Sequence, residues 1–172
     1  MCRPRSSKWL MAGKTNNVSN VEVVNCTIVD NHSTIGYGGA FFDPDGQVSL
    51  RNCIVWGNTA ARGVGAADQI SSGSGGTTLA SYCNIQGGWS GTANINADPL
   101  FVNAAAGEYQ LRPTSPCKNT GDSKINALPP DAGDLDWDTN TVEPTPRNLA
   151  QLARIRFTTV DMGAYEVQVA EE

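Results

Sequence analysis

The sequence has few charged residues and no long apolar run, and each shortage argues against a class of protein. Charged residues make up 17% of the 172 positions, and the 17 acidic residues outnumber the 12 basic ones. This acidic balance argues against a nucleic-acid partner, because a nucleic-acid groove needs a basic stripe. No apolar run approaches the roughly 20 residues of a membrane helix, so we predict no membrane span.

The start of the chain lacks the features of an export signal. Residues 1–13 are basic, but they contain no apolar stretch of the roughly 7–15 residues that a signal peptide needs. Two interpretations stay open: the chain stays inside the cell, or it is a fragment whose export signal is missing.

The chain also lacks the cysteine and histidine patterns of metal or triad chemistry. Its five cysteines include no CxxC pair, so the usual spacing of zinc ligands is absent. His32 is the only histidine, which argues against a zinc site or a catalytic triad. Stacked neighbouring strands would hold Cβ atoms about 4.8 Å apart, wider than disulfides prefer. We therefore predict four buried, unpaired cysteines, with Cys2 outside the pattern.

A repeated line of sequence is present instead. It reads VEVVNCTIVDN at 21–31, VSLRNCIVWGN at 48–58 and, more faintly, LASYCNIQGG at 79–88. Spacings of 27, 30 and 34 residues separate Cys26, Cys53, Cys83 and Cys117. Self-similarity with this period is typical of a solenoid.

The residue types of the repeat favour a coil of short strands. β-Branched runs broken by Gly and Asn show no helical periodicity. Cys26 and Ile28 are two residues apart, so they share one face of a strand, and stacking places cysteine above cysteine inside the coil. Asn25 and Asn52 precede the cysteines, and Asn tolerates left-handed backbone geometry at a sharp turn. Tyr82 occupies this place in the third repeat.

The chain divides into three parts of one all-β domain. We expect an N-terminal lead-in with the first strand at 1–17, the stacked repeats at 18–121, and an irregular C-terminal cap at 122–172. Residues 98–102 and 109–111 are expected to be strands of a fourth turn, with Cys117 opening its third strand. Residues 160–169 are expected to form a last strand that closes the stack.

Several blocks of the sequence resemble a known family. They are NCTIVDNHSTIGYGGAFF at 25–42, NINADPLFVN at 94–103, GEYQLRPTSPCKNTGD at 107–122, DLDWDTNTVEPTP at 134–146 and VDMGAYE at 160–166. Together they resemble bacterial, pectate-lyase-like right-handed parallel β-helix repeat proteins of the choice-of-anchor type. The resemblance implies a right-handed parallel β-helix, here of about four to five turns, and an extracellular or cell-surface setting. It implies no single activity.

One acidic segment is a candidate metal site. Asp134, Asp136 and Asp138 place oxygen ligands at alternate positions, as at the start of a calcium loop, so the cofactor that they suggest is Ca²⁺. Thr139 stands where an EF-hand needs Gly, so the alternative is a solvated acidic turn.

The catalytic candidates are few. Asp43 and Asp45, with Asp68 one turn away, are the best carboxylates for glycoside hydrolysis, although Asp-Pro-Asp-Gly is also an ordinary turn sequence. A polysaccharide lyase of the resembled fold would instead need a basic residue beside acidic calcium ligands, and Arg51 and Arg62 are available for that role.

The aromatic residues suggest binding rather than catalysis. Trp56 faces outward by its parity with Cys53, and Trp89 and Tyr37 lie in loops, so all three are candidates for stacking on sugars. The first expectation is a non-catalytic module that binds polysaccharide at the cell surface. A lyase or hydrolase remnant and a structural or assembly protein are the alternatives. An exposed N-terminal end of the coil would favour a homodimer unless residues 1–17 cover it.

Overall fold

The computed structural model describes residues 20–124 and 159–167, and within them the chain is an all-β protein, as predicted. The helical elements there are short: α1 (Ala66–Gln69) and the 3-10 turn η1 (Ala104–Ala106). The strands are β1 (Asn20–Val24), β2 (Thr27–Val29), β3 (His32–Ser33), β4 (Phe41–Asp43), β5 (Gln47–Arg51), β6 (Ile54–Trp56), β7 (Thr59–Ala60), β8 (Ile70–Ser72), β9 (Thr77–Ser81), β10 (Asn84–Ile85), β11 (Phe101–Asn103) and β12 (Glu108–Leu111).

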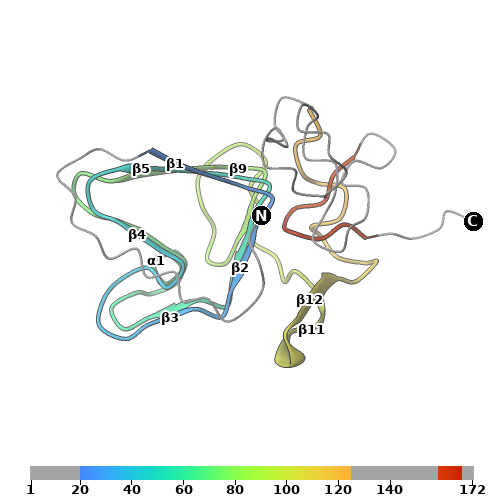
Figure 1. The fold of residues 1–172 in the computed structure, drawn as a ribbon, viewed down its shortest axis with the longest axis horizontal. Coiled ribbons are helices and arrows are strands. Elements are labelled where there is room, and N and C mark those ends of the chain that lie inside the picture. The colour runs from blue at the N-terminus through green and yellow to red at the C-terminus, as the bar shows by residue number, and fades with distance from the viewer. Residues whose placement is uncertain (1–19, 125–158, 168–172) are drawn as a thin grey trace, which may run out of the picture.

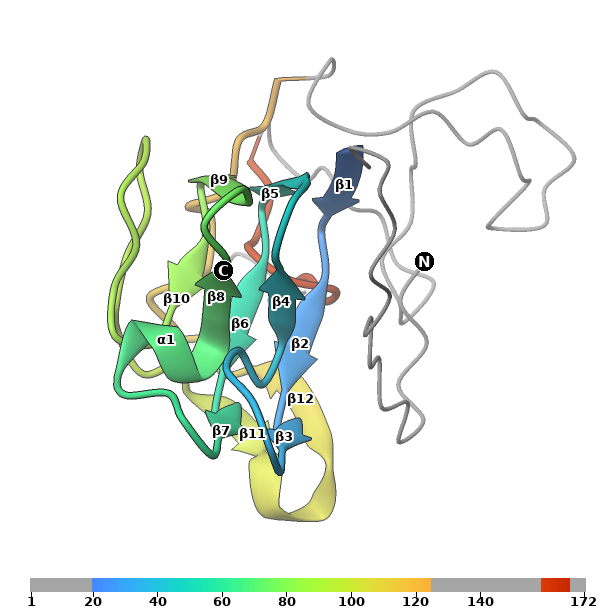
Figure 2. The same cartoon turned by 90° about the vertical axis from the view of Figure 1, so that its left-hand side faces the viewer.

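Strands from successive repeats pair in parallel. β1, β5 and β9 form one sheet, β2, β6 and β10 form another, and β3 pairs with β7 and β4 with β8. The registers follow the sequence repeat, because Val21 lies opposite Val48, which lies opposite Thr78. Figure 1 superposes the paired strands, and Figure 2 shows β10, β6 and β2 side by side. We call residues 20–33, 41–60 and 70–85 the first, second and third repeats.

A sharp corner precedes the cysteine of each repeat. Asn25, Asn52 and Tyr82 each have a φ of 53° there. The left-handed region is more accessible to Asn than to most other residues with a Cβ, because its short polar side chain can hydrogen-bond locally. The corner predicted from the two asparagines is confirmed, and Tyr82 keeps the same backbone conformation in the third repeat.

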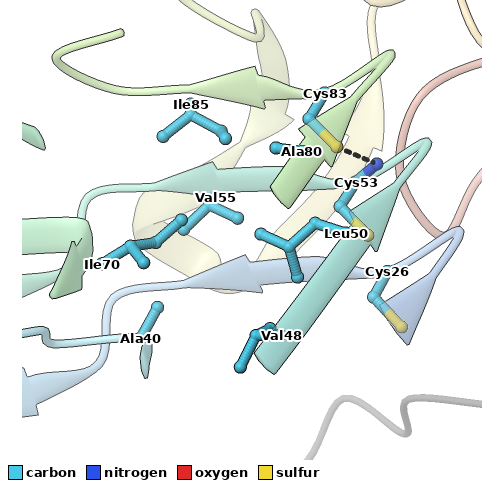
Figure 3. Packing of buried hydrophobic residues seen from close by; sticks show 10 residues of the cluster. All are labelled: Cys26, Ala40, Val48, Leu50, Cys53, Val55, Ile70, Ala80, Cys83 and Ile85. Carbon is cyan, nitrogen blue, oxygen red and sulfur yellow. Dashed lines mark hydrogen bonds between the residues drawn. The ribbon is translucent and has the colours of Figure 1, made fainter. Parts of the chain in front are cut away.

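Alternate residues of these strands build the main core. In β5, Val48 and Leu50 are buried while Ser49 and Arg51 are partly exposed. Figure 3 shows the buried members of this core, which are Cys26, Ala40, Val48, Leu50, Cys53, Val55, Ile70, Ala80, Cys83 and Ile85. The three cysteines within it are buried, as the sequence predicts. Stacking of equivalent residues thus fills the space between the sheets.

Cys117 lies in a second core and not in the column of stacked cysteines that the sequence predicts. The buried residues of this second core are Ile54, Leu111, Cys117 and Met162. The Asn84 side-chain amide donates to Cys117 Sγ over 3.0 Å. Asn84 lies between two main-core residues, Cys83 and Ile85, so it projects from the opposite face of its strand. Cys117 therefore packs outside the column that Cys83 belongs to, and does not stack above it.

The expectation that residues 98–102 and 109–111 form strands of a fourth turn is also wrong. β11 and β12 pair antiparallel with each other, and Figure 1 shows this hairpin in yellow beyond the parallel sheets. Four residues, 104–107, separate the two strands. A connection this short can join antiparallel strands only, since a parallel pair needs a crossover of about a dozen residues. Ile95 covers β10 instead, through a parallel bridge to Asn84 and a 2.8 Å bond from its N–H to Cys83 O.

The C-terminal segment crosses the second sheet rather than extending it. Residues 160–167 contain no strand, contrary to expectation. Their N–H groups find separate acceptors: Met162 donates to Cys117 O, Gly163 to Asn52 O and Ala164 to Thr27 Oγ1, over 3.0, 2.7 and 3.0 Å. Such scattered partners tie the segment across the first and second repeats, where a strand would need one continuous ladder.

Tyr109 links the hairpin to the first repeat, and its pKa is raised. Its hydroxyl donates to Asp30 Oδ2 over 2.7 Å. Burial, followed by the hydrogen bond and charge of Asp30, raises the pKa of Tyr109 to about 12. Because this folded-state pKa is raised, the contribution of the contact to stability is complete below about pH 10, the ordinary Tyr pKa, and is lost as pH rises toward 12.

We predict that Asp30→Asn lowers the pKa of Tyr109. The substitution removes the negative charge yet suits the left-handed backbone of residue 30, whose φ is 55°. The pKa is read from the ring signals of Tyr109 in an NMR pH titration. An unchanged pKa in the variant would show that Asp30 has no part in the shift.

Candidate functional site

The outer surface of the β1–β5–β9 sheet carries a regular set of side chains. Val48 and Leu50 point into the core, so Gln47, Ser49 and Arg51 lie on the other face. The in-register pairing extends this alternation to both neighbouring strands. We call the resulting surface the polar face, and its members with described side chains are Glu22, Val24, Gln47, Ser49, Arg51, Thr77, Leu79 and Ser81.

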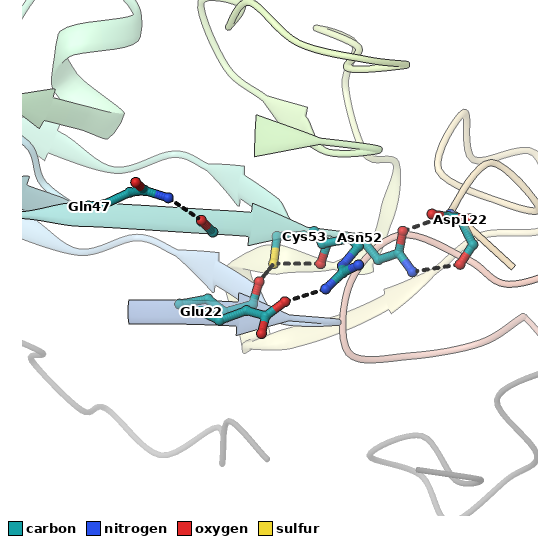
Figure 4. A network of polar contacts seen from close by, with 8 residues as sticks. Glu22, Gln47, Asn52, Cys53 and Asp122 are labelled. Carbon is teal, nitrogen blue, oxygen red and sulfur yellow. Dashed lines mark hydrogen bonds and ion pairs between the residues drawn. The ribbon is translucent and has the colours of Figure 1, made fainter. Parts of the chain in front are cut away.

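Contacts within the polar face hold planar polar groups in place. Arg51 Nη2 donates to Glu22 Oε1 across neighbouring strands, and Gln47 Nε2 donates to Ser49 Oγ over 3.3 Å (Figure 4). The Arg51 and Glu22 side chains stay accessible, at 31% and 58% exposed. An exposed pair of this kind contributes little to stability, on the order of 0–1 kcal/mol. The two side chains can therefore bind a ligand without loss of the folded structure.

Two apolar residues, Val24 and Leu79, interrupt this polar surface. Leu79 lies opposite Ser49 on the outer side of β9, and its side chain is 53% exposed. Parallel strands lie about 4.8 Å apart, so polar groups and an apolar contact are presented at short, regular intervals. This combination suits a flat ligand that has both hydroxyl groups and apolar C–H surface.

The structure does not bring the candidate catalytic carboxylates together. Asp43 Oδ1 accepts the Gly46 N–H over 2.8 Å, which is the hydrogen bond of a turn, and Asp45 is exposed in that turn. Asp68 precedes β8, whereas the register partner of Asp43 is Ser72 at the far end of that strand. Asp68 Oδ1 instead accepts the Ala60 N–H over 3.2 Å. Asp43 and Asp68 therefore each have a local structural contact.

The three candidate aromatics lie in different surroundings. Trp56 is half-buried against the second core. Trp89 packs on the main core, and its indole N–H donates to Thr78 O over 3.2 Å. Tyr37 is 45% exposed in the loop before β4. None of the three belongs to the polar face.

Tyr37 has exposed apolar neighbours that the sequence did not single out. Ile35 in the same loop is 85% exposed, and Val64 in the loop after β7 is 86% exposed. The two loops run together, because Arg62 N–H donates to Gly36 O over 3.0 Å. The repeat makes these loops adjacent, which single-residue patterns cannot reveal.

The candidate calcium ligands Asp134, Asp136 and Asp138 lie outside the described residues. Within residues 20–124 and 159–167, no cluster of three or more His, Cys, Asp or Glu side chains is arranged to hold a metal ion. In the same part of the chain, no helix has the length and hydropathy to span a bilayer.

A buried amide network beside β6 was missed by sequence reasoning. Asn58 Oδ1 accepts the Asn31 N–H over 3.0 Å, and Asn58 Nδ2 donates to Ile28 O and Gln69 Oε1 over 2.9 and 2.8 Å. Gln69 Nε2 returns a 2.7 Å bond to Asn58 O. The available signal was the asparagine that follows each of the first two repeat cysteines by five residues. This network holds the end of β6 that leads into β7.

Comparisons of the chain with protein-family models, with curated proteins and with solved structures find no match.

Proposed function

We infer that the parallel sheets are the walls of a right-handed parallel β-helix. The support is the in-register pairing of residues 27 and 30 positions apart, repeated corners of one backbone conformation, and a core of stacked equivalent residues. The resemblance of residues 18–167 to bacterial β-helix repeat proteins points the same way and supplies the handedness.

We propose that this β-helix is a non-catalytic module that binds carbohydrate along its polar face at a cell surface. The observation that carries the proposal is the row of planar side chains, from Glu22, Gln47 and Arg51, on a regular sheet beside exposed Leu79. Planar amide, carboxylate and guanidinium groups can each bond two neighbouring sugar hydroxyls. The apolar contact then accommodates the C–H face of a sugar ring.

The charges of the polar face favour an uncharged polysaccharide. Arg51 is the one cation of the polar face, and Glu22 already neutralises it. An acidic polysaccharide would need an uncompensated cation, and the whole chain has a net charge of −5. We therefore propose a neutral, unbranched sugar chain lying across β1, β5 and β9.

An NMR titration with neutral oligosaccharides tests this proposal. The amide signals of β1, β5 and β9 are expected to shift, while those of β11 and β12 stay in place. Arg51→Ala should weaken binding by roughly tenfold or more, because it removes a charged hydrogen-bond donor. Arg112→Ala is the matched control, since Arg112 is exposed on the hairpin and bonds Val102 O. Equal affinity in both variants would reject the polar face as the site.

A polysaccharide lyase is the second candidate, favoured by the contact of Arg51 with Glu22 across two repeats. A lyase needs a basic residue at the sugar, and Arg51 lies on the outer face. One acid beside it does not make a calcium site, and the described residues offer no larger cluster. Release of unsaturated sugar products by the wild-type chain, and their loss in Arg51→Lys, would favour the lyase over the binding module.

Assembly through the first repeat is the third candidate. Among the strands that the structure describes, β1 and β2 lie at the edges of their sheets, and within this part of the chain the buried side-chain amide of Asn25 has no hydrogen-bond partner. Both features suit the approach of another polypeptide strand, and we propose a second copy. Light scattering over a range of concentrations tests this, and a mass that stays monomeric throughout rejects it.

A further inference from the structure

The cysteines of the three repeats form a column inside the main core. Thr27 and Asn84 both pair with Ile54, so the preceding residues Cys26, Cys53 and Cys83 line up across three strands. Cys53 N–H donates to Cys83 Sγ over 3.4 Å, as Figure 3 shows. Cys53 and Cys83 are both fully buried. The Cys83 thiol thus contacts the main chain of Cys53, whose own thiol donates to Arg51 O and Val23 O over 3.2 and 3.4 Å.

We propose that Cys53 and Cys83 are a thiol–disulfide exchange site that links the second and third repeats, with a small-molecule disulfide as co-reactant. Neighbouring strands lie about 4.8 Å apart, which is within the Cα separation of disulfides, about 4.4–6.8 Å. The Cβ separation expected for stacked strands is wider than the roughly 3.8 Å that disulfides prefer. The link is therefore strained and readily reversed by excess thiol.

The two thiols are unequal, which sets the order of reaction. Hydrogen bonding from Cys53 lowers the pKa of Cys83. Burial raises the pKa of Cys53 well above its ordinary value. Since the thiolate is the nucleophile, Cys83 attacks first and Cys53 resolves the product.

The reagent can reach Cys83 when the short segment that covers this residue opens. The segment after β10 lies over this residue, with Asn94 Oδ1 accepting the Cys83 N–H over 3.0 Å and Asn94 Nδ2 donating to Ala80 O over 3.0 Å. Opening of this short segment uncovers Cys83 first. Cys53 stays enclosed between Cys26 and Cys83.

The reaction balances with one molecule of disulfide. Cys83 thiolate attacks one sulfur of the reagent, forms a mixed disulfide and releases the other half as a thiolate. That thiolate takes up the proton that Cys53 loses. Cys53 thiolate then attacks Cys83 Sγ and expels the second half of the reagent as a thiolate, which takes up the proton that Cys83 lost before its attack. Two protein thiols are thereby oxidised and one disulfide is reduced to two thiols.

The test treats the folded full-length chain with oxidised glutathione and maps the products by mass spectrometry. We expect a Cys53–Cys83 link with Cys26 and Cys117 still reduced, and its reversal by reduced glutathione. In Cys53→Ser, Cys83 should accumulate as the glutathione mixed disulfide, and Cys83→Ser should react at least tenfold more slowly. A Cys26–Cys53 link, or reaction only after unfolding, would overturn the proposal.

A second variant pair tests the entry route. Asn94→Ala should accelerate the link severalfold, because it loosens the segment over Cys83. Asn96→Ala is the matched control, since Asn96 Oδ1 accepts the Gly87 N–H over 3.1 Å in the same segment without contacting Cys83. Equal acceleration by both variants, or by neither, would show that the reagent does not enter there.

Discussion

Asn52→Ala is expected to destabilise the protein by roughly 3 kcal/mol and to release the C-terminal segments from the second sheet. Asn52 is fully buried, and its side chain makes a reciprocal pair with the main chain of Asp122, donating to its O over 3.1 Å and accepting its N–H over 2.7 Å. Figure 4 shows this pair. Alanine removes both bonds and places a less tolerant residue at a φ of 53°.

Asn25 provides a matched control for the Asn52 prediction. It has the same φ of 53°, yet neither polar atom of its side chain has a hydrogen-bond partner among residues 20–124 and 159–167. Asn25→Ala should therefore show the backbone penalty alone, about 1–2 kcal/mol. Urea denaturation of both variants gives the difference, and hydrogen exchange of residues 160–167 reports the release. Equal losses in the two variants would contradict a specific role of the Asp122 contact.

Asn58→Ala is expected to have a still larger effect, roughly 4 kcal/mol. The substitution leaves the Asn31 N–H and the Ile28 carbonyl without the bonds that the Asn58 side chain supplies. It also removes one bond to Gln69 Oε1, while the Asn58 main chain keeps its bonds to the Gln69 side chain. Since Asn58 and Gln69 are both only 2% exposed, water cannot replace these bonds without opening the core.

Asn31 supplies the comparison for Asn58. Asn31→Ala keeps the main-chain N–H and loses only bonds of a partly exposed amide to Val29 O and Asn58 Oδ1, so about 1 kcal/mol is expected. Thermal and urea unfolding of the two variants measure the contrast. A loss below about 1.5 kcal/mol for Asn58→Ala would mean that the network adds little to stability.

The sequence predicted the stacked part of the fold because its signals are local and periodic. Alternation by two within each strand assigned Cys53 and Val55 to one face, and equal spacing aligned the repeats. The left-handed corners at Asn25 and Asn52 followed from the residue type. The strand faces, the alignment of the repeats and the corners can all be predicted from the period and the residue types of the repeat.

The second core was beyond such reasoning because its contacts join distant, non-repeating segments. Cys117 continues the cysteine spacing, yet it packs with Ile54 and Met162 on the outer side of the second sheet. A spacing pattern cannot distinguish the two faces once the repeat has ended. The antiparallel hairpin was missed for the same reason, although its four-residue connection was a usable clue.

The polar face could not be predicted residue by residue. Arg51 was considered as a basic residue, but its partner Glu22 lies 29 positions away and becomes a neighbour only through the strand register. The aromatic residues are predicted to stack on sugars because of their residue type, whereas the structure packs Trp56 and Trp89 against the two cores. Of the three predicted binding aromatics, Tyr37 is the most exposed, at 45%.

A glycan array probed with the wild-type chain, with and without calcium, tests the proposed function most directly. We expect binding to neutral, unbranched polysaccharides that is independent of calcium and absent in Arg51→Ala. Binding confined to acidic glycans, or a blank array with folded protein, would contradict a carbohydrate site on the polar face.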